Sequence, residues 1–291
     1  MSIISRRLRI WGTVLIGIVF ALVIQSIFPE LNFTHYVSKI GPSAVLAIFL
    51  AALFCEYIDS SLGMGYGTTL TPMLMIFGFE PLQIVPCILL SELLTGFTSA
   101  VMHHRDGNVD LLRDPQARSA VITLSLLSAV GAIAAVTLAL RVPKVCLNTI
   151  IGIIIISAGI ITILTVGRKM SYRKSHLIII GTIASFNKGL SGGGYGPLVT
   201  SGQVVSGLSA KKAVAITSLT ESVTCLVGLC AYLLMKNTVD WSLAAPLTIG
   251  ALLSVPVATL TVRHLPEKVM KISVGVATFL LGMFILIKMI I

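Results

Sequence analysis

Long hydrophobic runs, separated by short polar connections, dominate the pattern of this chain. The stretches 10–28, 119–140, 145–167 and 241–262 each run 19 to 23 residues without a charged side chain. A helix of that length crosses a hydrocarbon core of about 30 Å. Helices also satisfy their own backbone hydrogen bonds inside a bilayer, and these runs lack the alternation typical of barrel strands. The pattern therefore predicts an all-α integral membrane protein.

The other hydrophobic segments are arranged as two short pieces followed by longer ones. Glycine-rich sequence separates the short pieces 42–58 and 63–79, and the longer segment 82–102 comes next. Pieces of roughly 12 to 17 residues are short for a full crossing, so we predict that each short pair enters and leaves the membrane on one side as a hairpin. The same order returns later in the chain, at 175–186, 192–207, 210–235 and 269–291.

An internal repeat connects these two regions. When the chain is shifted by 129 positions, residues 63–99 align with 192–228 without a gap, and nine of the 37 positions are identical. Self-similarity at a fixed offset is the sequence signature of a duplicated structural unit. The identical pairs are Gly63/Gly192, Gly65/Gly194, Tyr66/Tyr195, Gly67/Gly196, Thr71/Thr200, Gly78/Gly207, Val85/Val214, Glu92/Glu221 and Thr95/Thr224.

The repeat divides the chain into four parts. Residues 1–41 form an N-terminal transmembrane helix with an external loop, 42–167 the first repeat, 168–174 a basic linker and 175–291 the second repeat. Each repeat holds a hairpin pair and three long helices. Whether the short pair spans or re-enters, the number of crossings is odd, so the two copies face opposite ways. We therefore predict inverted repeats with broken helices, which many secondary transporters use to bind solutes at mid-membrane.

Composition and charge support a membrane protein and give it an orientation. Hydrophobic residues make up 56% of the chain and charged residues 11%, and the mean hydropathy is +0.99. The net charge of +10 does not indicate a nucleic-acid partner, because fifteen of the 21 Lys and Arg residues fall on one side of the alternating spans. The positive-inside rule then predicts a multi-pass protein of the cytoplasmic membrane, with its N-terminus cytoplasmic and its C-terminus external.

The glycine-rich breaks at 59–67 and 187–196 are the candidate binding site. A helix that restarts after a break presents unpaired amide groups and a partial positive charge, so two such ends attract an anion. Lys188 adds a full positive charge, whereas its counterpart in the repeat is Asp59. Tight helix crossing is the alternative use of small residues, and packing is the alternative role of the two tyrosines. The predicted contacts to the anion are Lys188, Asn187, Ser191, Gly192, Gly193, Gly194, Tyr195, Gly63, Gly65, Tyr66 and Thr68.

Two glutamates are predicted at mid-membrane depth. Glu92 and Glu221 are central in long apolar segments, and a carboxylate at such a position costs roughly 2.5–3.5 kcal/mol. With Asp59, Thr95 and Thr224 they form a second candidate set, either lining the site and coupling it to protons or making structural hydrogen bonds. At the end of segment 82–102, His103 and His104 are expected to be solvated loop residues.

Other classes of function fit less well. Gly-Tyr-Gly occurs twice, but a potassium filter needs Thr-Val-Gly-Tyr-Gly in fourfold symmetry. A membrane-embedded enzyme would need a nucleophile with a nearby base, and none is evident. We therefore predict a non-enzymatic protein, and no metal spacing, cofactor loop or ATP-binding motif is present in the sequence.

The motifs carry a family resemblance. The glycine-rich break followed by a long helix, the run His-His-Arg-Asp-Gly-Asn-Val-Asp at 103–110 and the duplicated layout resemble the sulfite exporter TauE/SafE family, also called the 4-toluene sulfonate uptake permease group. The resemblance extends from about residue 42 to the end. It implies a secondary carrier of small sulfur-containing anions such as sulfite, thiosulfate, sulfonates or sulfoacetate. The family often has small, glycine-rich sequence at both breaks, whereas this chain has Asp59 and Met64 at the first break. This difference makes the two halves chemically unequal.

Overall fold

The computed structural model describes residues 41–138, 174–191, 194–236 and 239–290, with three single positions between 156 and 164. Within these residues every regular element is a helix, so the all-α prediction is confirmed there. The predicted N-terminal span, most of the run 145–167 and most of the basic linker lie outside the described residues. The helices are α3 (Pro42–Leu62), α4 (Tyr66–Ile76), α5 (Pro81–Arg105), α6 (Pro115–Leu138), α8 (Lys174–Ser191), α9 (Tyr195–Val205), α10 (Ala210–Lys236), α11 (Trp241–His264) and α12 (Glu267–Ile290).

The outer surface of the bundle is apolar. Phe54, Leu126 and Val130 are 64%, 66% and 72% exposed, whereas Glu56, Asp59, Ser60 and Ser61 of α3 and Ser128 of α6 are buried. Such an inverted distribution suits a protein whose surroundings are lipid. Four helices of the described part, α3, α5, α10 and α11, are long and apolar enough to cross a bilayer.

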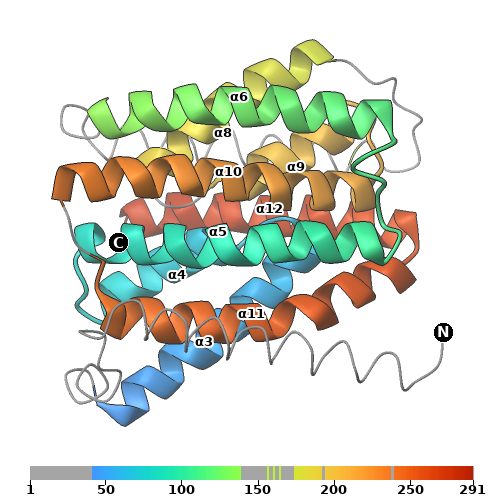
Figure 1. Cartoon of the computed structure of the whole chain (residues 1–291). Helices are drawn as coiled ribbons and strands as arrows, with labels where there is room; N and C mark the ends of the chain where they lie inside the picture. The colour runs from blue at the N-terminus through green and yellow to red at the C-terminus, as the bar shows by residue number, and fades with distance from the viewer. Residues whose placement is uncertain are drawn as a thin grey trace.

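The helices pack in an order that reads the same from both ends. Helices α5 and α10 lie side by side in the middle, α11 covers α5 and α6 covers α10, and the outer positions belong to α3 against α11 and α8 against α6 (Figure 1). The repeat offset pairs α3 with α8, α5 with α10 and α6 with α11. The contacts on the α5 side of the central pair therefore match those on the α10 side.

Small residues allow these helices to approach closely. A Cβ atom on Gly96 of α5 would lie 2.7 Å from the Ser218 carbonyl oxygen of α10, and Ser222 of α10 donates a hydrogen bond of 2.9 Å to the Leu93 carbonyl of α5. Gly131 of α6 would likewise meet the Ser185 Cβ at 2.7 Å. Backbone contact of this kind replaces bulky knob packing at the centre of the bundle.

The broken helices turn back at glycines. Gly63 after α3 has φ 73° and Gly194 before α9 has φ 77°, a conformation in which a side chain is strained. Figure 1 shows the start of α3 and the end of α4 on one side of the bundle, and the start of α8 and the end of α9 on the opposite side. This is the arrangement expected of two hairpins that enter from opposite faces.

The lengths of the hairpin arms differ from the prediction. Helix α3 has 21 residues and α8 has 18, both longer than the segments 42–58 and 175–186 expected from sequence. Their helical hydrogen bonding continues through Asp59-Ser-Ser and Asn187-Lys-Gly, where polar and glycine residues had indicated an earlier end. Helices α4 and α9 have 11 residues each and rise only about 16 Å. They reach about half-way through a hydrocarbon core.

The sequence Asp114-Pro115 predicts the start of α6, because an aspartate followed by a proline is a typical signal for the first turn of a helix, and α6 begins at Pro115. The Asp114 carboxylate accepts hydrogen bonds from the Gln116 and Ala117 amides at 2.9 and 3.4 Å. Its other oxygen accepts 2.5 Å from Lys212 at the start of α10. The Lys212 ammonium holds the pKa of Asp114 below its usual value. This carboxylate therefore caps one central helix and ties it to another from the opposite half.

Replacing Asp114 should separate these two roles. We expect Asp114→Ala to lower the free energy of unfolding by about 1–2 kcal/mol through loss of the cap, whereas Asp114→Asn keeps the cap and loses only the smaller ion-pair contribution. Because folding lowers the pKa of Asp114, its contribution is complete above the ordinary pKa of an aspartate and disappears as the pH falls through the lowered value. Thermal unfolding of the purified variants across this acidic range checks both points. Equal melting temperatures for Asn and Ala would contradict the capping role.

Candidate functional site

The two helix breaks are in direct contact. The Thr200 hydroxyl of α9 donates a hydrogen bond of 2.8 Å to the Gly63 carbonyl, and the Gly194 amide donates 2.9 Å to the Thr68 hydroxyl of α4. Gly196 packs so closely that a Cβ atom there would lie 2.7 Å from the Met64 Cα. The glycines of both breaks thus serve close packing in this conformation, which was one of the two roles considered from sequence.

Carboxylates of the protein itself occupy the amino-terminal end of α4. The Tyr66 amide donates to Asp59 Oδ1 at 3.4 Å, and the Gly67 amide donates to Glu92 Oε1 at 3.2 Å. A helix N-terminus attracts negative charge through its free amides and its dipole. The position at which an anion was predicted therefore binds anionic side chains in the described conformation.

Lys188 lies between Glu92 and Glu221. Its ammonium donates to Glu92 Oε2 of α5 and, at 2.8 Å, to Glu221 Oε1 of α10. Lys188, Glu92 and Glu221 are 1%, 2% and 4% exposed. Removing one member of such a buried pair costs about 3–5 kcal/mol, because the remaining charge loses its partner. The cation predicted to contact a ligand is thus engaged by two carboxylates that join the halves of the chain.

A further buried acid, Glu56 on α3, was missed in the sequence analysis. It is 1% exposed and accepts hydrogen bonds from the Ser60 hydroxyl at 2.6 Å and the Thr95 hydroxyl at 3.1 Å. The signal was available, because Glu56 and Asp59 are separated by one helical turn inside an apolar segment.

The other predicted site residues have the following places. Gly65, with φ 125°, lies in the turn of the first break. The Thr224 hydroxyl donates to the Thr220 carbonyl of its own helix at 2.8 Å. Asn187 and Ser191 belong to the end of α8. Gly192 and Gly193 lie outside the described residues.

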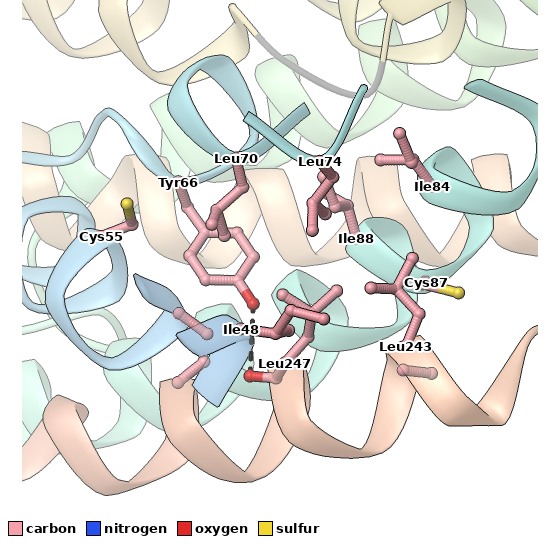
Figure 2. Packing of buried hydrophobic residues seen from close by; sticks show 13 residues of the cluster. Ile48, Cys55, Tyr66, Leu70, Leu74, Ile84, Cys87, Ile88, Leu243 and Leu247 are labelled. Carbon is pink, nitrogen blue, oxygen red and sulfur yellow. Dashed lines mark hydrogen bonds between the residues drawn. The ribbon is translucent and has the colours of Figure 1, made fainter. Parts of the chain in front are cut away.

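Both tyrosine side chains are part of the core. Figure 2 shows the Tyr66 ring among buried aliphatic side chains, with its hydroxyl directed toward Leu247 of α11. That hydroxyl bonds the Leu247 carbonyl at 3.3 Å and the Ser91 hydroxyl at 2.7 Å. The Tyr195 hydroxyl likewise lies 3.2 Å from the Ser128 hydroxyl of α6. Tyr66 therefore connects α4 to α11, and Tyr195 connects α9 to α6. These contacts favour the packing role of the tyrosines over contact with a ligand.

His103 and Asn108, within the run 103–110, form a buried polar junction at the end of α5. The expectation that His103 is solvated is wrong, since its side chain is fully buried. Its Nε2 lies 2.9 Å from the Ser60 carbonyl, and its Nδ1 lies 2.9 Å from the Asn108 amide nitrogen. An amide nitrogen only donates, so Nδ1 accepts and Nε2 carries the proton. Asn108 also donates 3.0 Å to the Thr259 carbonyl of α11, which joins this motif to the rest of the bundle.

The fold and these contacts define a class. The described part is an all-helical bundle with an apolar surface, two short helices that begin at glycine breaks, and a buried ionic cluster beside those breaks. Broken helices with charged groups at mid-depth are typical of secondary transporters.

Comparison with known proteins agrees with this class. A family model described as "Sulfite exporter TauE/SafE" matches residues 48–285, so the chain belongs to the TauE/SafE family. A relative from Bacillus subtilis (strain 168), described as "Probable membrane transporter protein YtnM", is 28% identical over 236 residues, which cover 77% of this chain and 76% of the relative. No solved structure matches the chain. The resemblance inferred from the motifs is therefore confirmed, and the chain is a membrane transporter of this family.

Proposed function

We propose that this chain is a secondary transporter that carries a small sulfur oxyanion or sulfonate across the cytoplasmic membrane by alternating access between two inverted repeats. The observation that carries the proposal is the cluster of Lys188, Glu92 and Glu221 beside the contacting breaks. The conformation of the Gly-Tyr-Gly tripeptides argues against a potassium-channel filter, because Tyr66 and Tyr195 are the first residues of helices rather than part of an extended backbone. The family supports the class of anion.

In this cluster a carboxylate of the protein can be replaced by the carboxylate or oxyanion of a solute. Glu92 accepts from both Lys188 and the Gly67 amide, so its carboxylate makes the contacts that a bound oxyanion would make. An entering anion competes with Glu92 for the ammonium and for the helix end. A displaced carboxylate in this buried position loses its partners, and its charged form is then strongly disfavoured. We therefore propose that one proton accompanies each anion.

A binding screen with purified protein tests the proposed substrate class. We expect sulfite, thiosulfate or a small sulfonate to raise the melting temperature at concentrations well above the dissociation constant, because a ligand that binds only the folded state stabilises it. Chloride and an equally sized neutral sulfone serve as controls and should leave it unchanged. Stabilisation by the sulfone, or by none of the sulfur anions, would contradict the proposal.

A further inference from the structure

The buried acids differ in the kind of partner that holds them. Glu92 accepts from an ammonium and a backbone amide, and Glu221 accepts from the same ammonium. These groups only donate, so they favour a carboxylate for as long as these contacts are made. Glu56 is bonded by two hydroxyls, those of Ser60 and Thr95. A hydroxyl can donate or accept, so this pair accommodates Glu56 both as a carboxylate and as a carboxylic acid.

The charges around Glu56 favour its neutral form. Among the described residues, the acidic groups that face it are Asp59 and the Cys55 thiol on α3, the Tyr66 phenol on α4, Glu92 on α5 and Glu221 on α10. The cation of this cluster, Lys188 on α8, makes its hydrogen bonds to Glu92 and Glu221. A carboxylate buried without a cationic partner is far less stable than the neutral acid. Glu56 therefore differs from the ion-paired glutamates in both charge and hydrogen bonding.

We propose that Glu56 carries a further proton through the transport cycle, beyond the one taken up as the anion binds; Glu56 is protonated in the described conformation and deprotonated when the site opens toward the side with fewer protons. In the release step the carboxylic acid gives its proton to water, leaving a carboxylate that accepts from both the Ser60 and the Thr95 hydroxyls. Reprotonation on the opposite side restores the acid. The inference deepens the proposed function and rests on it for the transport cycle, whereas the protonation state of Glu56 can be measured independently.

His103 contacts Ser60, one of the two residues whose hydroxyls bond Glu56. Its Nε2 hydrogen donates to the carbonyl of Ser60, the same residue whose hydroxyl bonds Glu56. This contact fixes Ser60 from the backbone side. His103 is thus a positioning residue for the hydroxyl, and it acts on Glu56 through Ser60.

Infrared spectroscopy of the purified, ligand-free protein is the first test. The carbonyl stretch of a protonated carboxyl group should be present at neutral pH, lose the Glu56 component in Glu56→Gln, and shift in Thr95→Val because one hydrogen bond to the group is removed. Glu80→Gln, the same change at an exposed position, is the matched control and should leave the band unchanged. An unaltered band in both Glu56→Gln and Thr95→Val would overturn the proposal. The Thr95→Val shift decides the matter should Glu56→Gln fail to fold.

Transport in proteoliposomes is the second test. With a sulfonate as probe, Glu56→Gln should lose accumulation driven by a pH gradient, at least tenfold, while Thr95→Val moves the pH profile. Accumulation driven by a sodium gradient and unaffected by pH would overturn the proton role in favour of a metal cation. A Glu56 band that behaves as expected, without sulfonate transport by any variant, would support the protonated acid and reject the proposed substrate class. Undiminished proton-driven accumulation in Glu56→Gln would reject the role of Glu56 alone.

Discussion

Lys188→Ala should abolish detectable binding of a sulfur anion and lower the free energy of unfolding by about 3–5 kcal/mol. The ammonium is buried and bonded to Glu92 and Glu221, so its removal leaves two carboxylates without a cation. Both effects follow from one set of contacts, because the charge that attracts the ligand under the proposed function also holds α5, α8 and α10 together. Chemical or thermal unfolding and anion titration of the same purified sample measure them.

A compensated variant separates the two effects. Lys188→Met combined with Glu92→Gln and Glu221→Gln removes the cation and both unpaired charges, and a buried ion cluster can often be replaced by neutral residues with little loss of stability. We expect this triple variant to regain most of the lost stability and still fail to bind the anion. Restored binding would show that Lys188 has only a structural role. Lys188→Arg keeps the charge but not the fit of the side chain, so its affinity for the anion should lie between those of the wild type and Lys188→Ala.

Gly196→Ala should have the second largest effect. The added methyl group would enter the Gly63 carbonyl oxygen and lie 2.7 Å from the Met64 Cα, both backbone positions that cannot rotate away. Overpacking of this kind costs about 1–3 kcal/mol, and the penalty falls on the conformation in which the breaks touch. Since each 1.4 kcal/mol is about tenfold in an equilibrium constant, this conformation should become roughly ten- to hundredfold less populated relative to others.

The matched control for this prediction is Gly228→Ala in α10. There the new Cβ would meet only the flexible Leu89 side chain, at 3.2 Å and beyond, and Ala also favours a helix more than Gly does. Anion flux in proteoliposomes should fall at least about tenfold for Gly196→Ala and remain near wild type for Gly228→Ala. Normal flux with Gly196→Ala would mean that the breaks need not come into contact during transport.

The sequence was informative wherever a physical constraint acts locally. Long apolar runs predicted the helices, and Asp114-Pro115 predicted the start of α6. Glycine-rich sequence predicted the breaks, where Gly63 and Gly194 have positive φ in the structure. A charge within an apolar run is conspicuous for the same reason, so Glu92 and Glu221 could be selected without a structure. The inverted order of the two halves remains a prediction, supported by the symmetric packing around α5 and α10.

Contacts between distant segments could not be predicted from one sequence. Lys188 is 96 positions from Glu92 and 33 from Glu221, and neither separation has a period that predicts proximity. The same limit explains why Lys188 was expected to be a free cation. His103 bonds the carbonyl of Ser60 on α3, which is 43 positions earlier in the chain. Tyrosine hydroxyls posed the same difficulty, since their partners Leu247 and Ser128 lie on flanking helices.

The account also explains why an anion carrier would keep so many acids in its core. Glu56, Asp59, Glu92 and Glu221 are all buried, and they would repel a negative solute if all were ionised and unpaired. Glu92 and Asp59 bond the helix end, Glu92 and Glu221 bond Lys188, and Glu56 is bonded by hydroxyls. Under the proposed function Glu92 occupies the anion site between transport events and accepts a proton when the substrate displaces it.

Calorimetric titration of the wild-type protein with a small sulfonate measures whether anion binding is coupled to proton uptake. A sulfonate stays fully ionised near neutral pH, so any proton uptake belongs to the protein. Repeating the titration at one pH in buffers of different ionisation enthalpy counts the protons taken up on binding. The account predicts uptake of about one proton per sulfonate and tighter binding as the pH falls. Binding without proton uptake, and with the same affinity at every pH, would contradict it.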